Sequence, residues 1–108
     1  MRDQRHVILT PLAKRDLNQI WRYAAREYSE LAADTIVGRI TAALQVLAAA
    51  PRIGSVRSEY PGSPRGFPVR SHIVFYVPLE DTKGIAVWRI LHGARDLRRL
   101  VRKPEGKN

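Results

Sequence analysis

The chain has 108 residues, enough for one domain with a modest hydrophobic core and too few for two. Nineteen Lys and Arg against ten Asp and Glu give a net charge of +9, which favours contact with polyanions or an acidic partner. No Cys is present, and any zinc site would have to be built from three His and carboxylates, so we expect no metal and no cofactor. Because no stretch approaches the about 18 apolar residues that span a bilayer and the N terminus lacks an apolar signal region, we expect a cytoplasmic protein with no membrane contact.

The first half of the chain predicts a strand followed by two helices. His6 to Leu9 is a short apolar run, and Thr10 followed by Pro11 is a typical N-cap and first-turn pair. Apolar residues then recur every three or four positions over 12–27, and again after Ser29, with basic residues between them in the first run. Since only one or two residues separate the two runs, they predict an antiparallel helical hairpin.

The second half predicts three strands after a long loop. Residues 52–65 are rich in Pro, Gly, Ser and charge, and apolar runs follow at 66–69, 72–77 and 84–91. Strands joined by such short turns pair antiparallel. The expected fold is therefore α+β with the order β-α-α-β-β-β, in which an N-terminal helical hairpin packs on one face of a small antiparallel sheet and leaves the other face uncovered.

The domain organisation follows from the same pattern. We expect a single domain over 1–108, with a core of about 6–101 and a flexible tail at 102–108. A short helical turn is predicted at 97–101, just before that tail. Neither repeats nor low-complexity tracts occur in the sequence.

One arginine stands inside the most apolar strand. The segment 85–97, IAVWRILHGARDL, is a strand that ends in a polar turn, and Arg89 interrupts its apolar run. A guanidinium in such a strand is costly unless it is paired or faces water. Since side chains alternate along a strand, we expect Trp88 and Ile90 to face the helices and Arg89 to face the uncovered side of the sheet.

Two roles are open for His92. A metal-independent ribonuclease needs a base, an acid and cationic groups around the phosphate, and His92, Arg89 and Tyr76 supply these types, with His72 as a second base or acid. Alternatively, His92 bonds the backbone and fixes the corner, while Asp96 caps the helix that follows or pairs with its neighbour Arg95. We favour the structural role.

Four segments together resemble a known family. They are LTPLAKRDLNQIWRYAA, LAAAPRIG, RGFPVRSHIVFYVP and RILHGARDL, and in this order they look like the ParE branch of the ParE/RelE superfamily, the toxins of bacterial type II toxin-antitoxin modules. The resemblance covers about 7–100 and implies the fold derived above. It also implies a toxin that poisons DNA gyrase by direct binding, without being an enzyme, and that a ParD-like antitoxin neutralises.

Site residues are expected on two surfaces. The gyrase-binding surface is predicted around the C-terminal corner, at His92, Arg95, Arg98, Arg99 and Arg102. The antitoxin, through an acidic amphipathic C-terminal segment, is predicted to contact Arg89, Trp21, Arg22 and Arg70, with DNA reached only through the antitoxin. Two alternatives remain: a RelE-like ribosome-dependent mRNA endoribonuclease that uses His92, Arg89 and Tyr76, and a non-toxic remnant that only binds antitoxin.

Overall fold

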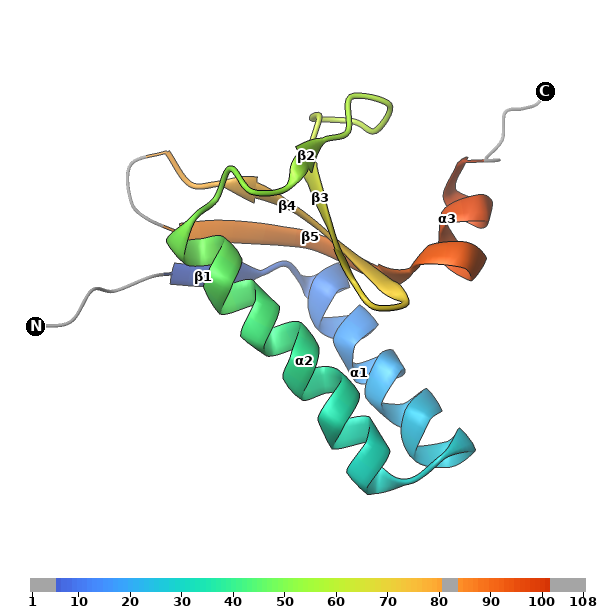
Figure 1. The fold of residues 1–108 in the computed structure, drawn as a ribbon. Coiled ribbons are helices and arrows are strands. Elements are labelled where there is room, and N and C mark those ends of the chain that lie inside the picture. Colours follow the sequence, from blue (N-terminus) through green and yellow to red (C-terminus); the bar gives the residue numbers. More distant parts are fainter. Residues whose placement is uncertain (1–5, 81–83, 102–108) are drawn as a thin grey trace, which may run out of the picture.

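The computed structural model describes residues 6–80 and 84–101, with side chains as far as residue 97. The predicted α+β order is confirmed, and two elements extend it, because a two-residue strand lies in the expected loop and the last helix begins directly after the last strand (Figure 1). The expected tail at 102–108 lies outside the described residues. The elements are β1 (His6–Leu9), α1 (Pro11–Glu27), α2 (Glu30–Ala49), β2 (Ser55–Val56), β3 (Arg65–Val69), β4 (His72–Pro78), β5 (Gly84–His92) and α3 (Gly93–Val101).

Both hairpin helices begin at the N-caps that the sequence predicts. The Thr10 hydroxyl accepts a hydrogen bond from the Ala13 amide at 3.1 Å and donates to the Trp88 carbonyl of β5 at 3.0 Å. The Ser29 hydroxyl accepts from the Ala32 amide at 2.9 Å. Each cap of this kind stabilises a helix by about 1 kcal/mol. Thr10 therefore both starts α1 and fixes that start against the sheet.

The sheet has the strand order β1-β5-β4-β3-β2. The antiparallel pairing expected for β3, β4 and β5 is confirmed. The first strand, however, pairs parallel to β5, with His6 opposite Gly84, so the sheet is mixed rather than purely antiparallel. A parallel neighbour requires a crossover connection, and here the crossover contains every element between the two strands. No local pattern could have indicated it.

The helical hairpin covers one face of the sheet, as predicted (Figure 1). Contrary to the sequence expectation, α2 is long and apolar enough in composition to cross a bilayer. Its apolar face nevertheless packs on the sheet, which accounts for this composition. The main core consists of Ala13, Ile40, Leu44, Leu47, Ala48, Val74, Tyr76, Ile85, Val87 and Ile90.

The prediction that the other face of the sheet is uncovered is wrong. Tyr60, from the loop between β2 and β3, packs edge-on against Phe75 with ring centroids 5.2 Å apart, and also lies 6.3 Å from Trp88. Leu97 of α3 packs against the same cluster, whose buried members are Tyr60, Phe75 and Leu91. The long loop and the last helix therefore close this face with a small second core.

A β-bulge at Trp88 decides which side chains face the helices. In the β4–β5 ladder Phe75 pairs with Arg89 and Tyr76 pairs with Val87, so Trp88 is an extra residue without a partner. An extra residue shifts the alternation of side chains by one position. The expectation for Ile90 is therefore correct and that for Trp88 is wrong. The helix side receives Val87 and Ile90, and the second core receives Trp88 and Leu91.

Candidate basic cleft

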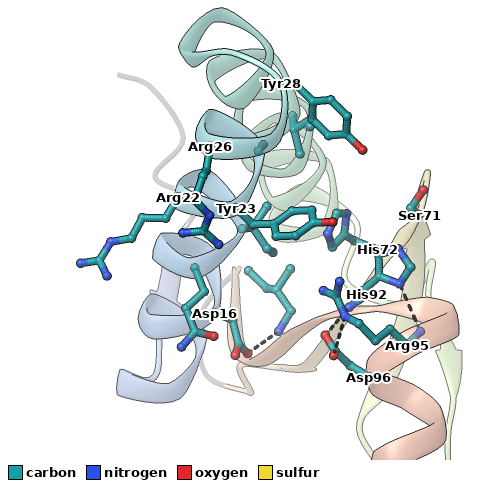
Figure 2. Close-up of a pocket in the computed structure, with 15 residues that line it drawn as sticks. Asp16, Arg22, Tyr23, Arg26, Tyr28, Ser71, His72, His92, Arg95 and Asp96 are labelled. Carbon is teal, nitrogen blue, oxygen red and sulfur yellow. Dashed lines mark hydrogen bonds and ion pairs between the residues drawn. The ribbon is translucent and has the colours of Figure 1, made fainter.

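A cleft of about 570 Å³ opens between α1 and the corner where β5 passes into α3 (Figure 2). Tyr23 projects from α1 toward the corner, and the guanidinium of Arg95 lies over its ring at 5.5 Å from the centroid. Two further arginines of α1, Arg22 and Arg26, line the cleft, and neither forms an ion pair among the described residues. The cleft is therefore electropositive, in keeping with the net charge of the chain.

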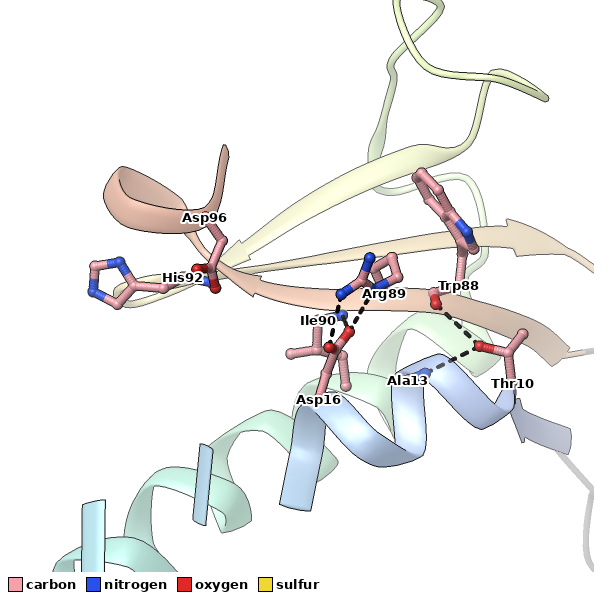
Figure 3. A network of polar contacts seen from close by, with 8 residues as sticks. All are labelled: Thr10, Ala13, Asp16, Trp88, Arg89, Ile90, His92 and Asp96. Atoms are coloured by element: carbon pink, nitrogen blue, oxygen red, sulfur yellow. Dashed lines mark hydrogen bonds and ion pairs between the residues drawn. The ribbon is translucent and has the colours of Figure 1, made fainter. Parts of the chain in front are cut away.

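Asp16 in the wall of the cleft ties α1 to β5 (Figure 3). Its side chain is 7% exposed, and its two oxygens accept from the Arg89 guanidinium at 2.8 and 2.9 Å and from the Ile90 amide at 2.9 Å. The hydrogen bond to Asp16 raises the pKa of Arg89 above its ordinary value. Arg89 pairs with Phe75 of the second core, so its position in the ladder is on the face away from the hairpin, as predicted. The sequence did not indicate that a buried carboxylate of α1 binds its guanidinium.

The corner residues cap the last helix. The amide of Arg95 donates to Nδ1 of His92 at 3.2 Å, and Oδ2 of Asp96 accepts from the His92 amide at 2.9 Å. These reciprocal bonds resemble a capping box, and Asp96 also accepts from the Arg95 side chain at 3.3 Å. The structural interpretation of His92 fits this geometry. Helix α3 begins at Gly93 rather than near residue 97, so Asp96 lies in its first turn instead of at its N-cap.

The structure does not bring together the three residues considered for a nuclease. Tyr76 is fully buried, and its hydroxyl donates to the Pro51 carbonyl at 2.8 Å and accepts from the Gly54 amide at 2.9 Å. Burial raises the pKa of Tyr76 above its usual range. Since Arg89 is bound to Asp16, only His92 of the three lines the cleft.

His72 and His92 form a pair that the sequence did not indicate. They lie opposite each other in the β4–β5 ladder, with ring centroids 5.5 Å apart and an angle of 83° between the rings. Burial lowers the pKa of His72, and the neighbouring His92 and Arg95 lower it further, while Asp96 acts in the opposite direction. The pairing of the two histidines depends on the register of β4 against β5. The bulge at Trp88 changes that register, and the sequence pattern did not reveal the bulge.

A second depression of about 240 Å³ continues the cleft toward the β3–β4 turn. Arg70 stands at this turn with a positive φ of 58°, and Arg39 of α2 lines the same depression. The two hollows share Ile36, Ser71 and His72, so they form one groove along the hairpin. Among the antitoxin-binding residues expected from the sequence, Arg22 and Arg70 line this groove.

The remaining predicted site residues are placed less favourably or lie beyond what is described. The Trp21 indole donates to the Asp34 carboxylate of α2 at 2.8 Å and thereby joins the two helices. Arg98 and Arg99 belong to α3, but their side chains are not described. Arg102 lies outside the described residues. Of the predicted gyrase-binding residues, the structure therefore places the side chains of His92 and Arg95, side by side at the corner.

Comparison with known proteins places this helix-on-sheet architecture in a class. A solved structure titled "Chromosomal ParDE TA system from P. aeruginosa" superimposes with a TM-score of 0.67 at 22% sequence identity, covering 80% of this chain and 92% of that one. No curated protein matches the sequence. Residues 7–97 match the family described as "ParE toxin of type II toxin-antitoxin system, parDE". The chain belongs to this family, and it is the toxin component of a type II toxin-antitoxin system.

Proposed function

We propose that this toxin inhibits DNA gyrase by direct protein contact, through the basic corner formed by His92, Arg95, Arg98, Arg99 and Arg102. The proposal rests chiefly on membership of the ParE family. Arg95 in the first turn of α3 adds to it, because 53% of its side chain is exposed, and the sequence has three more arginines within the next seven residues. Arginine side chains suit a large acidic or nucleic-acid-bound partner, because their planar guanidinium binds carboxylates and phosphates in bidentate fashion.

A nuclease mechanism has less support from the geometry. Tyr76 is buried under α2 and bonded to two backbone groups, and Arg89 is held by a buried carboxylate. Neither group is placed to contact an RNA phosphate beside His92. The ribosome-dependent alternative is nevertheless easy to separate, because it acts on a different target.

Gyrase inhibition is expected to depend on the arginines of α3. The double substitution Arg98→Gln/Arg99→Gln should raise the toxin concentration needed to block supercoiling by about tenfold, as expected for the loss of charged contacts at an interface. The matched control is Lys14→Gln/Arg15→Gln, which removes two exposed charges from α1 outside the cleft and should change inhibition by less than about twofold. Purified wild-type toxin that leaves supercoiling intact but arrests translation on ribosomes would contradict the gyrase proposal.

We further propose that a ParD-like antitoxin lays an acidic amphipathic segment along the groove beside the hairpin. Apolar side chains at its floor include Ile36, Ile40 and Val69, and Arg39 and Arg70 stand at its side. Such a groove suits a helix or strand that carries apolar residues on one face and carboxylates on the other. Arg22 and Arg70 are the better candidates for contact, since Arg89 and Trp21 already bond to carboxylates within the chain.

Antitoxin binding is expected to weaken as salt rises. Between about 50 and 500 mM NaCl, the Kd of a ParD-like antitoxin should increase at least about tenfold, because salt screens exposed charge pairs. Arg70→Gln should flatten this dependence, whereas Arg52→Gln, an exposed arginine outside both hollows, should leave it unchanged. Isothermal titration calorimetry over the salt series measures both. An affinity independent of salt would contradict the electrostatic part of the proposal.

A further inference from the structure

The corner end of the cleft gathers hydrogen-bond donors from three elements. His72 comes from β4, His92 from the end of β5 and Arg95 from α3, and the Ser71 side chain stands beside them. Arg22 and Arg26, one helical turn apart on α1, also line the cleft. Five nitrogen-bearing side chains of basic type thus surround one hollow, although they are distant from one another in the sequence.

The acidic groups of the cleft are already engaged. Asp16 accepts three hydrogen bonds from Arg89 and Ile90, and Asp96 accepts from the His92 amide and the Arg95 side chain. Their charge is therefore offset within the wall. Arg22 and Arg26, which also line the cleft, have no ion-pair partner among the described residues, so their positive charge is not offset. An anion is the ligand that such a cavity favours.

The histidine pair is oriented to donate. Because Nδ1 of His92 accepts the Arg95 amide, the neutral ring carries its proton on Nε2, the nitrogen remote from that bond. The ring of His72 meets the ring of His92 edge-on at 5.5 Å. Two imidazoles at this separation, with a guanidinium beside them, match the several oxygens of a phosphate group, which accepts hydrogen bonds in more directions than a single carboxylate does.

The cleft is larger than a lone anion requires. Its volume of about 570 Å³ lies in the range of small-molecule sites, which is about 300–1,000 Å³. Tyr23 of α1 and Tyr28, the C-cap of that helix, contribute aromatic surface to it. Tyr23 is 43% exposed and Tyr28 is 69% exposed. Aromatic rings of this kind stack against nucleobases.

We propose that this cleft binds a nucleotide, with its phosphate held by His72, His92 and Arg95 and its base against the tyrosines of α1. The cleft shares His92 and Arg95 with the proposed gyrase surface and Arg22 with the proposed antitoxin groove, so the test of this inference contains neither protein. The phosphate monoester is the recognised group, whether it comes from a free nucleotide or from the end of a nucleic acid.

The chain contains three histidines, which provide a test with an internal control. Two line the cleft, and the third, His6, is exposed on β1 and does not. In a titration of the full chain with AMP, followed by NMR of the imidazole ring signals, the signals of His72 and His92 should shift and saturate while that of His6 stays in place. Equal movement of all three, or movement of none, would overturn the proposal.

Calorimetry with matched variants locates the ligand. Arg95→Gln should weaken AMP binding by about tenfold, as expected for one lost charge-assisted hydrogen bond, and Arg15→Gln, which removes a charge from α1 outside the cleft, should not. Inorganic phosphate should bind more weakly than AMP, and equal affinities would overturn the role of the base.

Two further ligands test where the phosphate comes from and whether the ligand is a nucleotide or an acidic peptide. A 5′-phosphorylated tetranucleotide that binds as well as AMP or better, and that shifts the same two histidines, would support the proposal and assign the phosphate to a nucleic-acid end. Weaker binding of the tetranucleotide than of AMP would support a free nucleotide. Poly-L-glutamate that shifts His72 and His92 when AMP does not would overturn the nucleotide assignment in favour of an acidic peptide.

Discussion

Asp16→Ala is expected to lower the free energy of unfolding by about 3–5 kcal/mol, the range typical of breaking a buried ion pair by removing one partner. The substitution leaves the partly buried guanidinium of Arg89 without its carboxylate and leaves the Ile90 amide without an acceptor. It also removes the polar link between α1 and β5, which form one wall of the basic cleft. Urea denaturation followed by circular dichroism measures the loss.

A control substitution at an exposed carboxylate separates the effect of burial on stability from the effect of losing a negative charge. Asp34→Ala removes an exposed Asp that accepts one bond from Trp21, and it should cost no more than about 1 kcal/mol. The double substitution Asp16→Leu/Arg89→Met should regain most of the lost stability, since an apolar pair of similar volume often replaces a buried ion pair without loss. A cost below about 1 kcal/mol for Asp16→Ala would show that water readily replaces the carboxylate.

Gly84→Ala is expected to destabilise the protein by about 3 kcal/mol or more, through the combined cost of backbone strain and a steric clash. Gly84 has a φ of 146°, which L-residues rarely adopt, and an added Cβ would lie 2.3 Å from the His6 carbonyl oxygen. Since His6 and Gly84 are the first pair of the parallel β1–β5 ladder, relief of the clash must separate the two strands. Thermal unfolding measures the effect.

The same substitution at Gly38 should stabilise the protein instead of destabilising it. Gly38 lies inside α2, and an added Cβ there meets nothing within 4 Å. Alanine is favoured over glycine in a helix interior by roughly 0.5–1 kcal/mol, so Gly38→Ala should raise the melting temperature. If both substitutions lowered stability equally, the clash with β1 would be the wrong explanation for Gly84→Ala, and a general intolerance of the fold to alanine would be indicated.

The candidate site was only partly predictable. The sequence marked the corner at His92, Arg95 and Asp96 because a strand pattern ended there in a Gly-containing polar turn. It did not show that His72 lies opposite His92, or that Arg22 and Arg26 of α1 line the same cleft. Strand register and the docking of α1 determine these positions, and both arise from contacts between distant segments.

The sequence by itself determined the local structure of this protein. Thr10 and Ser29 begin the two helices, apolar periodicity marks their buried faces, and short polar turns force β3, β4 and β5 to be antiparallel. These features depend on neighbours within a few residues, where propensity and capping act. The family resemblance rested on the same ordered segments and is confirmed.

The tertiary structure alone decided which side chains meet. One extra residue in β5, at Trp88, shifts the alternation, so that Trp88 enters the second core while Ile90 stays in the main core. The bond between Arg89 and Asp16 joins residues 73 positions apart. A period-2 pattern gives correct faces only while the ladder is regular, and a bulge is set by pairing with the adjacent strand. The parallel contact of β1 with β5 likewise joins segments almost 80 residues apart, whose meeting no local signal encodes.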